Sequence, residues 1–214
     1  MSNWLFLQSA IRKPWQMGSM LPSSRSLARA MVDLADIGEG HQVVELGAGN
    51  GSFTRELVER HPDLPLLAFE LCPRLGADLA RRFPSVRVVI DAAEHLPRRA
   101  PSLGLTRIDR VVSGLPWALW DEQRQAAVVA TLIPFLSPEA RLVTVHYLPS
   151  RWIGWVQTTR RVLERHFDRV YHGSPVWRNF PPAYVHVAER PRLRSGAADR
   201  MRIGVDDGGT ATPA

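Results

Sequence analysis

Three acidic residues, Glu45, Glu70 and Asp91, each follow a short apolar run of the kind that forms a buried strand. Carboxylates accept hydrogen bonds from hydroxyl, amide and ammonium groups, so each of the three is a candidate ligand-binding residue. In an open α/β sheet, ligands bind outside the carboxyl ends of the strands. Taken singly, each acid is also explained as a solvated surface residue. Three of them on consecutive strand ends predict one polar binding site.

A glycine-rich turn directly follows the first of these acids. The sequence Glu45-Leu46-Gly47-Ala48-Gly49-Asn50-Gly51 leads into a helix that is expected to begin at Ser52. Glycine at three alternate positions lets a ligand approach the backbone closely. The spacing differs from the dinucleotide-binding fingerprint, because the third glycine comes two residues after the second and not three. The turn therefore predicts a backbone cradle for a different ligand.

The composition fits a globular chain with one sizeable core to position such a site. The chain has 214 residues, of which 45% are hydrophobic and 22% are charged. Its single cysteine, Cys72, excludes a disulfide framework and a cysteine-rich metal cluster. The histidines are scattered without metal-ligand spacing, so no metal is predicted. No apolar run is long enough to span a membrane, and no secretory signal is expected.

Short apolar runs alternate with helical patterns, which predicts an α/β fold with a mostly parallel sheet and helices on both faces. Strands are expected at 43–46, 66–69, 86–90, 108–112, 142–146, 167–171 and 183–188. Helices are expected at 52–60, 74–83, 121–135 and 152–166. The last two strands follow one another without a helix between them, so a terminal antiparallel pairing is expected.

The segment from Val43 to Thr54 resembles motif I of the class I S-adenosylmethionine-dependent methyltransferases. The resemblance implies a Rossmann-like, seven-stranded sheet with a terminal antiparallel strand. It also implies S-adenosyl-L-methionine (SAM) as cofactor and S-adenosyl-L-homocysteine as product. In this family the glycine turn holds the homocysteine moiety, and acids placed like Glu45, Glu70 and Asp91 contact the ammonium, ribose and adenine groups. The residues expected to contact the cofactor are Glu45, Gly47, Ala48, Gly49, Gly51, Glu70, Leu71, Asp91, Ala92 and Ser113.

The sequence Ser113-Gly114-Leu115-Pro116-Trp117 follows the fourth expected strand, where amine-directed methyltransferases carry their substrate motif. The ribosomal RNA adenine dimethylases have Asn-Leu-Pro-Tyr there. Ser-Gly-Leu-Pro instead resembles the bacterial phospholipid N-methyltransferases that act on phosphatidylethanolamine. Segments 21–28, 146–147 and 179–185 resemble that family as well. The residues expected to act at the substrate are Tyr147, Ser113, Trp117 and His146, with the aromatic rings placed to attract a methylated ammonium group.

The resemblance implies N-methylation of a phospholipid head group, from phosphatidylethanolamine towards phosphatidylcholine. Another amino lipid, such as an ornithine lipid, is an alternative substrate. The net charge of +6 favours polyanionic partners, which include nucleic acid as well as anionic lipid. Methylation of ribosomal RNA adenine, or of another nucleic acid, is therefore the second hypothesis. A cofactor-binding protein without catalysis is the third.

The N-terminal segment combines aromatic and cationic residues, among them Trp4, Phe6, Arg12, Lys13 and Trp15. Such a segment is typical of helices that lie in a membrane interface, although it could also pack on the core of its own domain. The expected organisation is a membrane-surface and lid segment over 1–21, a methyltransferase domain over 22–190 and a flexible tail over 191–214. We expect a cytoplasmic protein held peripherally on the inner face of the membrane, with residues 2–15 contacting anionic lipid.

Overall fold

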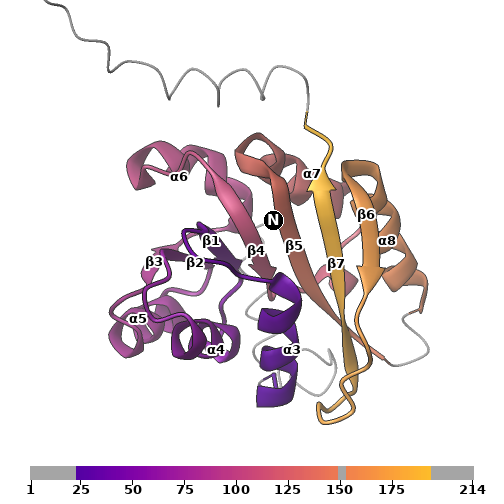
Figure 1. Cartoon of the computed structure of the whole chain (residues 1–214), viewed down its shortest axis with the longest axis horizontal. Coiled ribbons are helices and arrows are strands. Elements are labelled where there is room, and N and C mark those ends of the chain that lie inside the picture. The colour runs from indigo at the N-terminus through magenta and orange to yellow at the C-terminus, as the bar shows by residue number, and fades with distance from the viewer. Residues whose placement is uncertain (1–22, 149–152, 194–214) are drawn as a thin grey trace, which may run out of the picture.

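One seven-stranded sheet organises the residues that this computed structural model describes, 23–148 and 153–193 (Figure 1). Its strands are β1 (Val43–Leu46), β2 (Leu66–Glu70), β3 (Arg87–Ile90), β4 (Ile108–Ser113), β5 (Leu136–Tyr147), β6 (Phe167–His172) and β7 (Ala183–Pro191). The helices are α3 (Arg25–Ala35), α4 (Ser52–Arg60), α5 (Pro73–Arg82), α6 (Leu96–Leu103), α7 (Glu122–Leu132) and α8 (Ile153–His166), with short 3-10 turns η1 (Ala93–His95), η2 (Trp117–Leu119) and η3 (Ile133–Phe135). The predicted α/β class is confirmed.

The strand order β3-β2-β1-β4-β5-β7-β6 confirms the mostly parallel sheet with an antiparallel final strand. β1 to β5 pair in parallel, whereas β7 pairs antiparallel with both β5 and β6. The last strand in the chain therefore lies inside the sheet, between β5 and β6. As a consequence, the loop from β6 into β7 lies at the same edge as the carboxyl ends of the parallel strands (Figure 1).

Helices cover both faces of the sheet, as predicted. On one face, α3, α4 and α5 pack Leu27, Leu57 and Leu79 against alternate strand residues. On the other face, α6, α7 and α8 contribute a second buried cluster, which includes Leu96 and Val162. Because successive strand residues point to opposite faces, the short apolar runs of β1, β2 and β4 fill both clusters at once.

Two helices were not predicted from the sequence. α3 begins at its N-cap Ser24, whose Oγ accepts a hydrogen bond from Leu27 N at 3.1 Å. α6 contains Pro101, a residue that normally interrupts a helical pattern and so hides this short helix from periodicity. α3 matters for the site because its N-terminus lies beside the end of β5.

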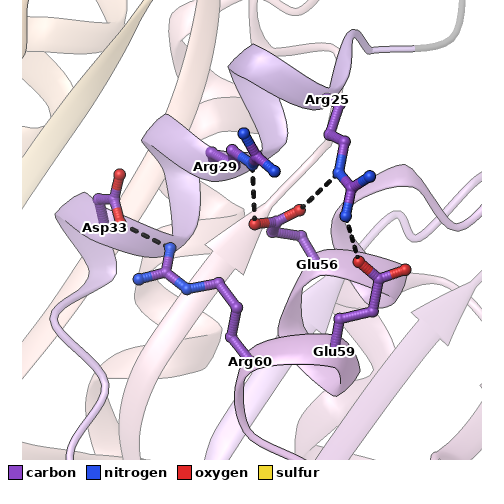
Figure 2. Close-up of a pocket in the computed structure, with 6 residues that line it drawn as sticks. All are labelled: Arg25, Arg29, Asp33, Glu56, Glu59 and Arg60. Atoms are coloured by element: carbon purple, nitrogen blue, oxygen red, sulfur yellow. Dashed lines mark hydrogen bonds and ion pairs between the residues drawn. The ribbon is translucent and has the colours of Figure 1, made fainter.

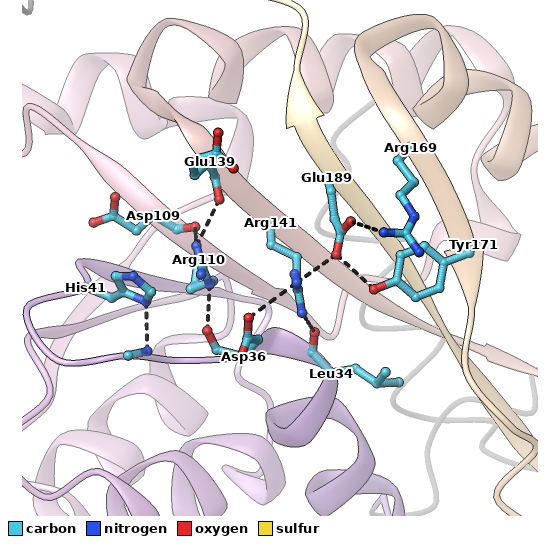
Figure 3. A network of polar contacts seen from close by, with 11 residues as sticks. Leu34, Asp36, His41, Asp109, Arg110, Glu139, Arg141, Arg169, Tyr171 and Glu189 are labelled. Carbon is cyan, nitrogen blue, oxygen red and sulfur yellow. Dashed lines mark hydrogen bonds and ion pairs between the residues drawn. The ribbon is translucent and has the colours of Figure 1, made fainter.

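A polar network fixes the other end of α3 to the sheet (Figure 3). Arg110 Nε donates to Asp36 O at 3.0 Å, and Arg141 Nη1 donates to Leu34 O at 2.9 Å. These guanidinium groups satisfy carbonyls that the end of a helix leaves unpaired. Arg141 also pairs with Glu189 Oε1 on β7, at 2.7 Å. The network thereby holds α3 in one position against β4, β5 and β7.

The segments expected over 1–21 and in most of 191–214 lie outside the described residues, so the membrane-surface and tail assignments stay predictions. β7 continues to Pro191, one residue past the expected end of the domain. Within the described part of the chain, no helix has the length and apolarity needed to cross a membrane.

Candidate cofactor and substrate site

The glycine turn between β1 and α4 adopts a conformation that favours glycine. Gly47, Gly49 and Gly51 have φ angles of 72°, 56° and 80°, in the left-handed region. Gly51 also faces the Leu79 side chain, which a Cβ at residue 51 would meet at 2.7 Å. The amides of Gly47 and Ala48 both donate to Phe69 O on β2, at 2.9 and 3.1 Å. The turn is therefore a rigid backbone loop at the carboxyl end of the sheet.

Glu45, on β1, has a fully buried carboxylate with one partnered oxygen. Its Oε2 accepts a hydrogen bond from Thr54 Oγ1 on α4 at 2.7 Å. No donor among the described residues reaches its Oε1. Burial raises the pKa of Glu45 to about 7. A buried carboxylate with an unpartnered oxygen fits an ammonium group, which would supply both a donor and the compensating charge. The sequence did not point to Thr54.

Glu70 ends β2, and both of its carboxylate oxygens accept hydrogen bonds from the backbone. Oε2 accepts from Gly49 N at 2.7 Å, and Oε1 accepts from Cys72 N at 2.8 Å. These bonds fix the side chain and join the glycine turn to the end of β2. Each oxygen has a second lone pair, so the carboxylate can still accept from two hydroxyl groups. Leu71 lies half-buried beside it.

Asp91, just after β3, is engaged by neighbouring residues of its own chain. Its Oδ2 accepts from Arg99 Nε at 2.6 Å, and its Oδ1 accepts from Ala92 N at 2.8 Å and lies 2.7 Å from His95 Nδ1. Partial burial opposes ionisation, but the bonds from His95 and Arg99 prevail and lower the pKa of Asp91 to about 2. Contacts of Asp91 and Ala92 with adenine stay predictions.

Ser113 and Trp117 bind each other at the end of β4. Trp117 Nε1 donates to the buried Ser113 Oγ at 2.9 Å. The Trp117 side chain is 1% exposed and packs in the cluster under α6, α7 and α8. Its ring therefore belongs to the core, and its contact with the substrate stays a prediction.

Gly114 packs directly against the glycine turn. Its amide donates to Leu46 O at 2.8 Å. A Cβ at residue 114 would lie 2.7 Å from Gly47 O and 3.4 Å from the Phe53 ring. Contacts that close to a carbonyl oxygen would force the turn to move. The substrate motif and the cofactor motif are thus packed backbone to backbone, which explains why glycine stands between Ser113 and Leu115.

His146 and Tyr147 lie on opposite faces of β5, because side chains alternate along a strand. Tyr147 packs with the cluster under α3, α4 and α5, whereas His146 is buried on the α8 face. The structure therefore does not bring these two side chains together, and the role predicted for each at the substrate stays a prediction. Burial lowers the pKa of His146 to about 4, and no donor or acceptor in the described residues reaches its Nε2.

His186, on β7, was not predicted and lies next to His146. Their ring centroids are 4.6 Å apart. Burial, together with the charge that His146 carries when it is protonated, lowers the pKa of His186 to about 3. Both rings are therefore neutral near pH 7 and are weak bases. The described residues hold no group of three or more histidine, cysteine or acidic side chains arranged for a metal.

The three segments that resemble the lipid enzymes meet at the end of β5. The Tyr147 hydroxyl is hydrogen-bonded to the Ser23 side chain, and burial raises the pKa of Tyr147. Ser24 N donates to Asn179 Oδ1 at 2.9 Å, and Asn179 Nδ2 donates to Pro181 O at 2.7 Å. Residues 155 positions apart thus share one place at the carboxyl edge of the sheet, the edge that also carries the glycine turn. This is the candidate substrate end of the site.

A surface pocket of about 440 Å³ lies between α3 and α4, and its lining side chains form ion pairs with one another (Figure 2). Glu56 faces two guanidinium groups, with Arg25 Nε at 3.8 Å and Arg29 Nε at 3.6 Å. The lining residues are Arg25, Arg29, Asp33, Glu56, Glu59 and Arg60. Three cations oppose three carboxylates, so the pocket has no net charge for an anion, and we assign it no ligand.

The fold is that of a class I SAM-dependent methyltransferase. A SAM-dependent O-methyltransferase from Thermotoga maritima superposes with a TM-score of 0.61 at 15% identity, covering 86% of this chain and 72% of that one. This similarity concerns the fold alone. No protein-family model matches the chain.

Sequence similarity to curated proteins places the chain more narrowly. It is 31% identical over 186 residues to the ornithine lipid N-methyltransferase of Singulisphaera acidiphila, covering 84% of this chain and 92% of that enzyme. The chain belongs to the same family of SAM-dependent methyltransferases, and SAM is its cofactor. The ribosomal RNA small subunit methyltransferase A of Streptococcus pneumoniae is 32% identical over 110 residues, but this covers only 47% of this chain and 36% of that protein.

Proposed function

We propose that this enzyme transfers methyl groups from SAM to the primary amine of a membrane amino lipid, either an ornithine lipid or phosphatidylethanolamine. The observation that supports this most is the extent of the similarity to the ornithine lipid enzyme, which includes 92% of that enzyme's length. Ser23, Tyr147 and Asn179, which belong to the segments that resemble the lipid enzymes, lie together at the candidate substrate end. We further propose that the enzyme works on the inner face of the membrane, with residues 2–15 contacting anionic lipid.

Gly114 argues against the nucleic-acid alternative. The ribosomal RNA adenine dimethylases carry asparagine before Leu-Pro-Tyr, and Gly114 stands before Leu115 and Pro116. A Cβ there would lie 2.7 Å from Gly47 O, so this glycine turn does not accommodate an asparagine. A site without that amide has no such group to hold the exocyclic amine of adenine.

The residues of the chain then have defined tasks. SAM supplies an electrophilic methyl group when bound. Glu45, Glu70 and the glycine turn would hold SAM through its ammonium group, its ribose and its carboxylate end. The substrate amine must be neutral to attack, and an alkylammonium has a pKa of about 10 in water. Desolvation beside the half-buried Tyr147 would lower that pKa, and the Tyr147 hydroxyl would accept or donate a hydrogen bond that orients the amine. Holding the reactants aligned is worth about 7–11 kcal/mol in such reactions.

The test offers purified enzyme and SAM to three substrates in parallel: vesicles with ornithine lipid, vesicles with phosphatidylethanolamine, and total RNA. Mass spectrometry detects methylated products in each. We expect methylated lipid with at least one vesicle type. The Glu45→Gln variant should be inactive, whereas Glu59→Gln, which changes an exposed carboxylate on α4, should retain activity. Methylated RNA with unmodified lipid would overturn the proposal.

A further inference from the structure

We propose that the loop between β6 and β7 is a membrane-contact element, in which Trp177 and Phe180 enter the interface of an anionic bilayer. The inference rests on the proposed action on a lipid and concerns how the enzyme reaches it. It is carried by residues of the described chain and does not depend on the N-terminal segment.

The loop presents two large aromatic side chains to solvent. Trp177 is 73% exposed and Phe180 is 80% exposed, more than any other large hydrophobic residue among 23–148 and 157–193, where side-chain burial is described. Soluble surfaces seldom leave two such neighbouring side chains uncovered, and an exposed apolar patch marks a contact site. Leu148, also exposed, lies beside them, because its amide donates to Pro182 O at 2.7 Å. The loop and the residue that follows β5 thus present three exposed apolar side chains from joined backbone segments.

The loop is held rigidly with the aromatic side chains outward. Asn179, between Arg178 and Phe180, is buried, and its side chain bonds to Ser24 N and Pro181 O. Val176 N donates to Ala183 O at 2.6 Å and closes the loop at its base. The anchored Asn179 therefore turns its neighbours away from the domain. An aromatic ring held this way loses little conformational freedom when it enters a membrane.

Charge identifies the bilayer as anionic. Arg178 stands between the two aromatic residues, is exposed, and takes part in no ion pair within the described residues. Tryptophan with neighbouring arginine is the combination found at membrane interfaces, where the ring lies at head-group depth and the cation meets lipid phosphate. An RNA partner would require several cations along its phosphate backbone, whereas this loop combines one arginine with two exposed aromatic side chains, which suits a bilayer interface better.

The position of the loop suits a lipid substrate. It lies at the carboxyl edge of the sheet, where β1 and β4 end (Figure 1). Asn179 binds Ser24, and the neighbouring Ser23 binds Tyr147 of the candidate substrate end. A bilayer in contact with Trp177 and Phe180 would therefore present its head groups beside this end of the site.

The test uses a polarity-sensitive fluorophore on Phe180→Cys in a full-length Cys72→Ser background, since Cys72 is the only cysteine. Because Phe180 is exposed, the change removes no core contact. The matched control carries the label at Glu139→Cys, an exposed position at the start of β5 and so at the opposite edge. Vesicles contain phosphatidylcholine alone or an equal mixture with phosphatidylglycerol. We expect a blue shift and increased emission at 180, only with the anionic vesicles, and no change at 139.

Partition measurements extend the test. Trp177→Ser combined with Phe180→Ser should weaken binding to anionic vesicles about tenfold or more, and Arg178→Ala about fivefold. Affinity for S-adenosylhomocysteine should not change in either variant.

A label at 180 that stays in water on bound vesicles would overturn the inference. A label at 180 that is already in an apolar environment before vesicles are added would also overturn it, since another part of the chain would then cover the loop. If lipid is still methylated in either case, the proposed function stands and only the loop assignment fails. If the label inserts but no lipid is methylated, the loop assignment stands and the proposed function fails.

Discussion

Replacing Glu45 by glutamine should stabilise the ligand-free protein at alkaline pH while weakening cofactor binding. Burial raises the pKa of Glu45 from 4.5 to about 7, so the folded protein holds this proton more tightly than the unfolded chain. The protonated form contributes its whole stabilisation below pH 4.5, and this contribution is lost as the pH rises through about 7. At roughly 1.36 kcal/mol per pKa unit, the loss between pH 5.5 and 8 is about 2 kcal/mol.

Glutamine keeps an acceptor for Thr54 Oγ1 but does not ionise. Raising the pH from 5.5 to 8 should therefore stabilise the Glu45→Gln variant by about 2 kcal/mol relative to the native protein, measured as the free energy of unfolding. Urea unfolding at the two values measures it, and groups that titrate alike in both proteins cancel. Calorimetry should show S-adenosylhomocysteine binding reduced roughly 10-fold to 100-fold, because a buried charged hydrogen bond is lost. A stability difference that does not vary with pH would refute the reasoning.

Two further substitutions distinguish residues that shape the cofactor site from residues that only stabilise the fold. Gly114→Ala places a Cβ 2.7 Å from Gly47 O and should reduce cofactor affinity at least tenfold in calorimetry; unchanged affinity would contradict the packing of the two motifs. Arg141→Ala removes the bonds to Leu34 O and Glu189 and should lower the free energy of unfolding by about 2–4 kcal/mol in urea titrations, while cofactor affinity stays within about twofold. A loss of affinity without a loss of stability would assign Arg141 to the site.

The central strands β1, β2 and β4 could be predicted closely because their apolar runs are buried on both faces and end in turn residues. β5, in contrast, begins at Leu136, six residues before its expected start at 142. β1 is observed at the expected 43–46, and α4 at the expected 52–60. The opposite orientation of His146 and Tyr147 also follows from strand alternation, so the sequence did contain that information. By contrast, α6 could not be recognised, since Pro101 interrupts its pattern.

The partners of the site residues depend on tertiary contacts. The bond from Thr54 to Glu45 requires α4 to pack on β1, and the bond from Asn179 to Ser24 requires α3 to lie against the last loop. Likewise, the burial of Trp117 follows from the packing of helices around η2. Residue type and spacing located the site, but these distances follow from the assembled sheet.

The central claim is that the methyl group goes to a lipid amine. It is tested most directly by one reaction in which the enzyme receives a limiting amount of methyl-labelled SAM with ornithine lipid vesicles, phosphatidylethanolamine vesicles and total RNA together. Extraction into organic solvent then separates lipid from RNA. We predict that the label enters the organic phase as N-methylated head groups and that Glu45→Gln abolishes the transfer. Label in the RNA, with none in the lipid, would contradict the account.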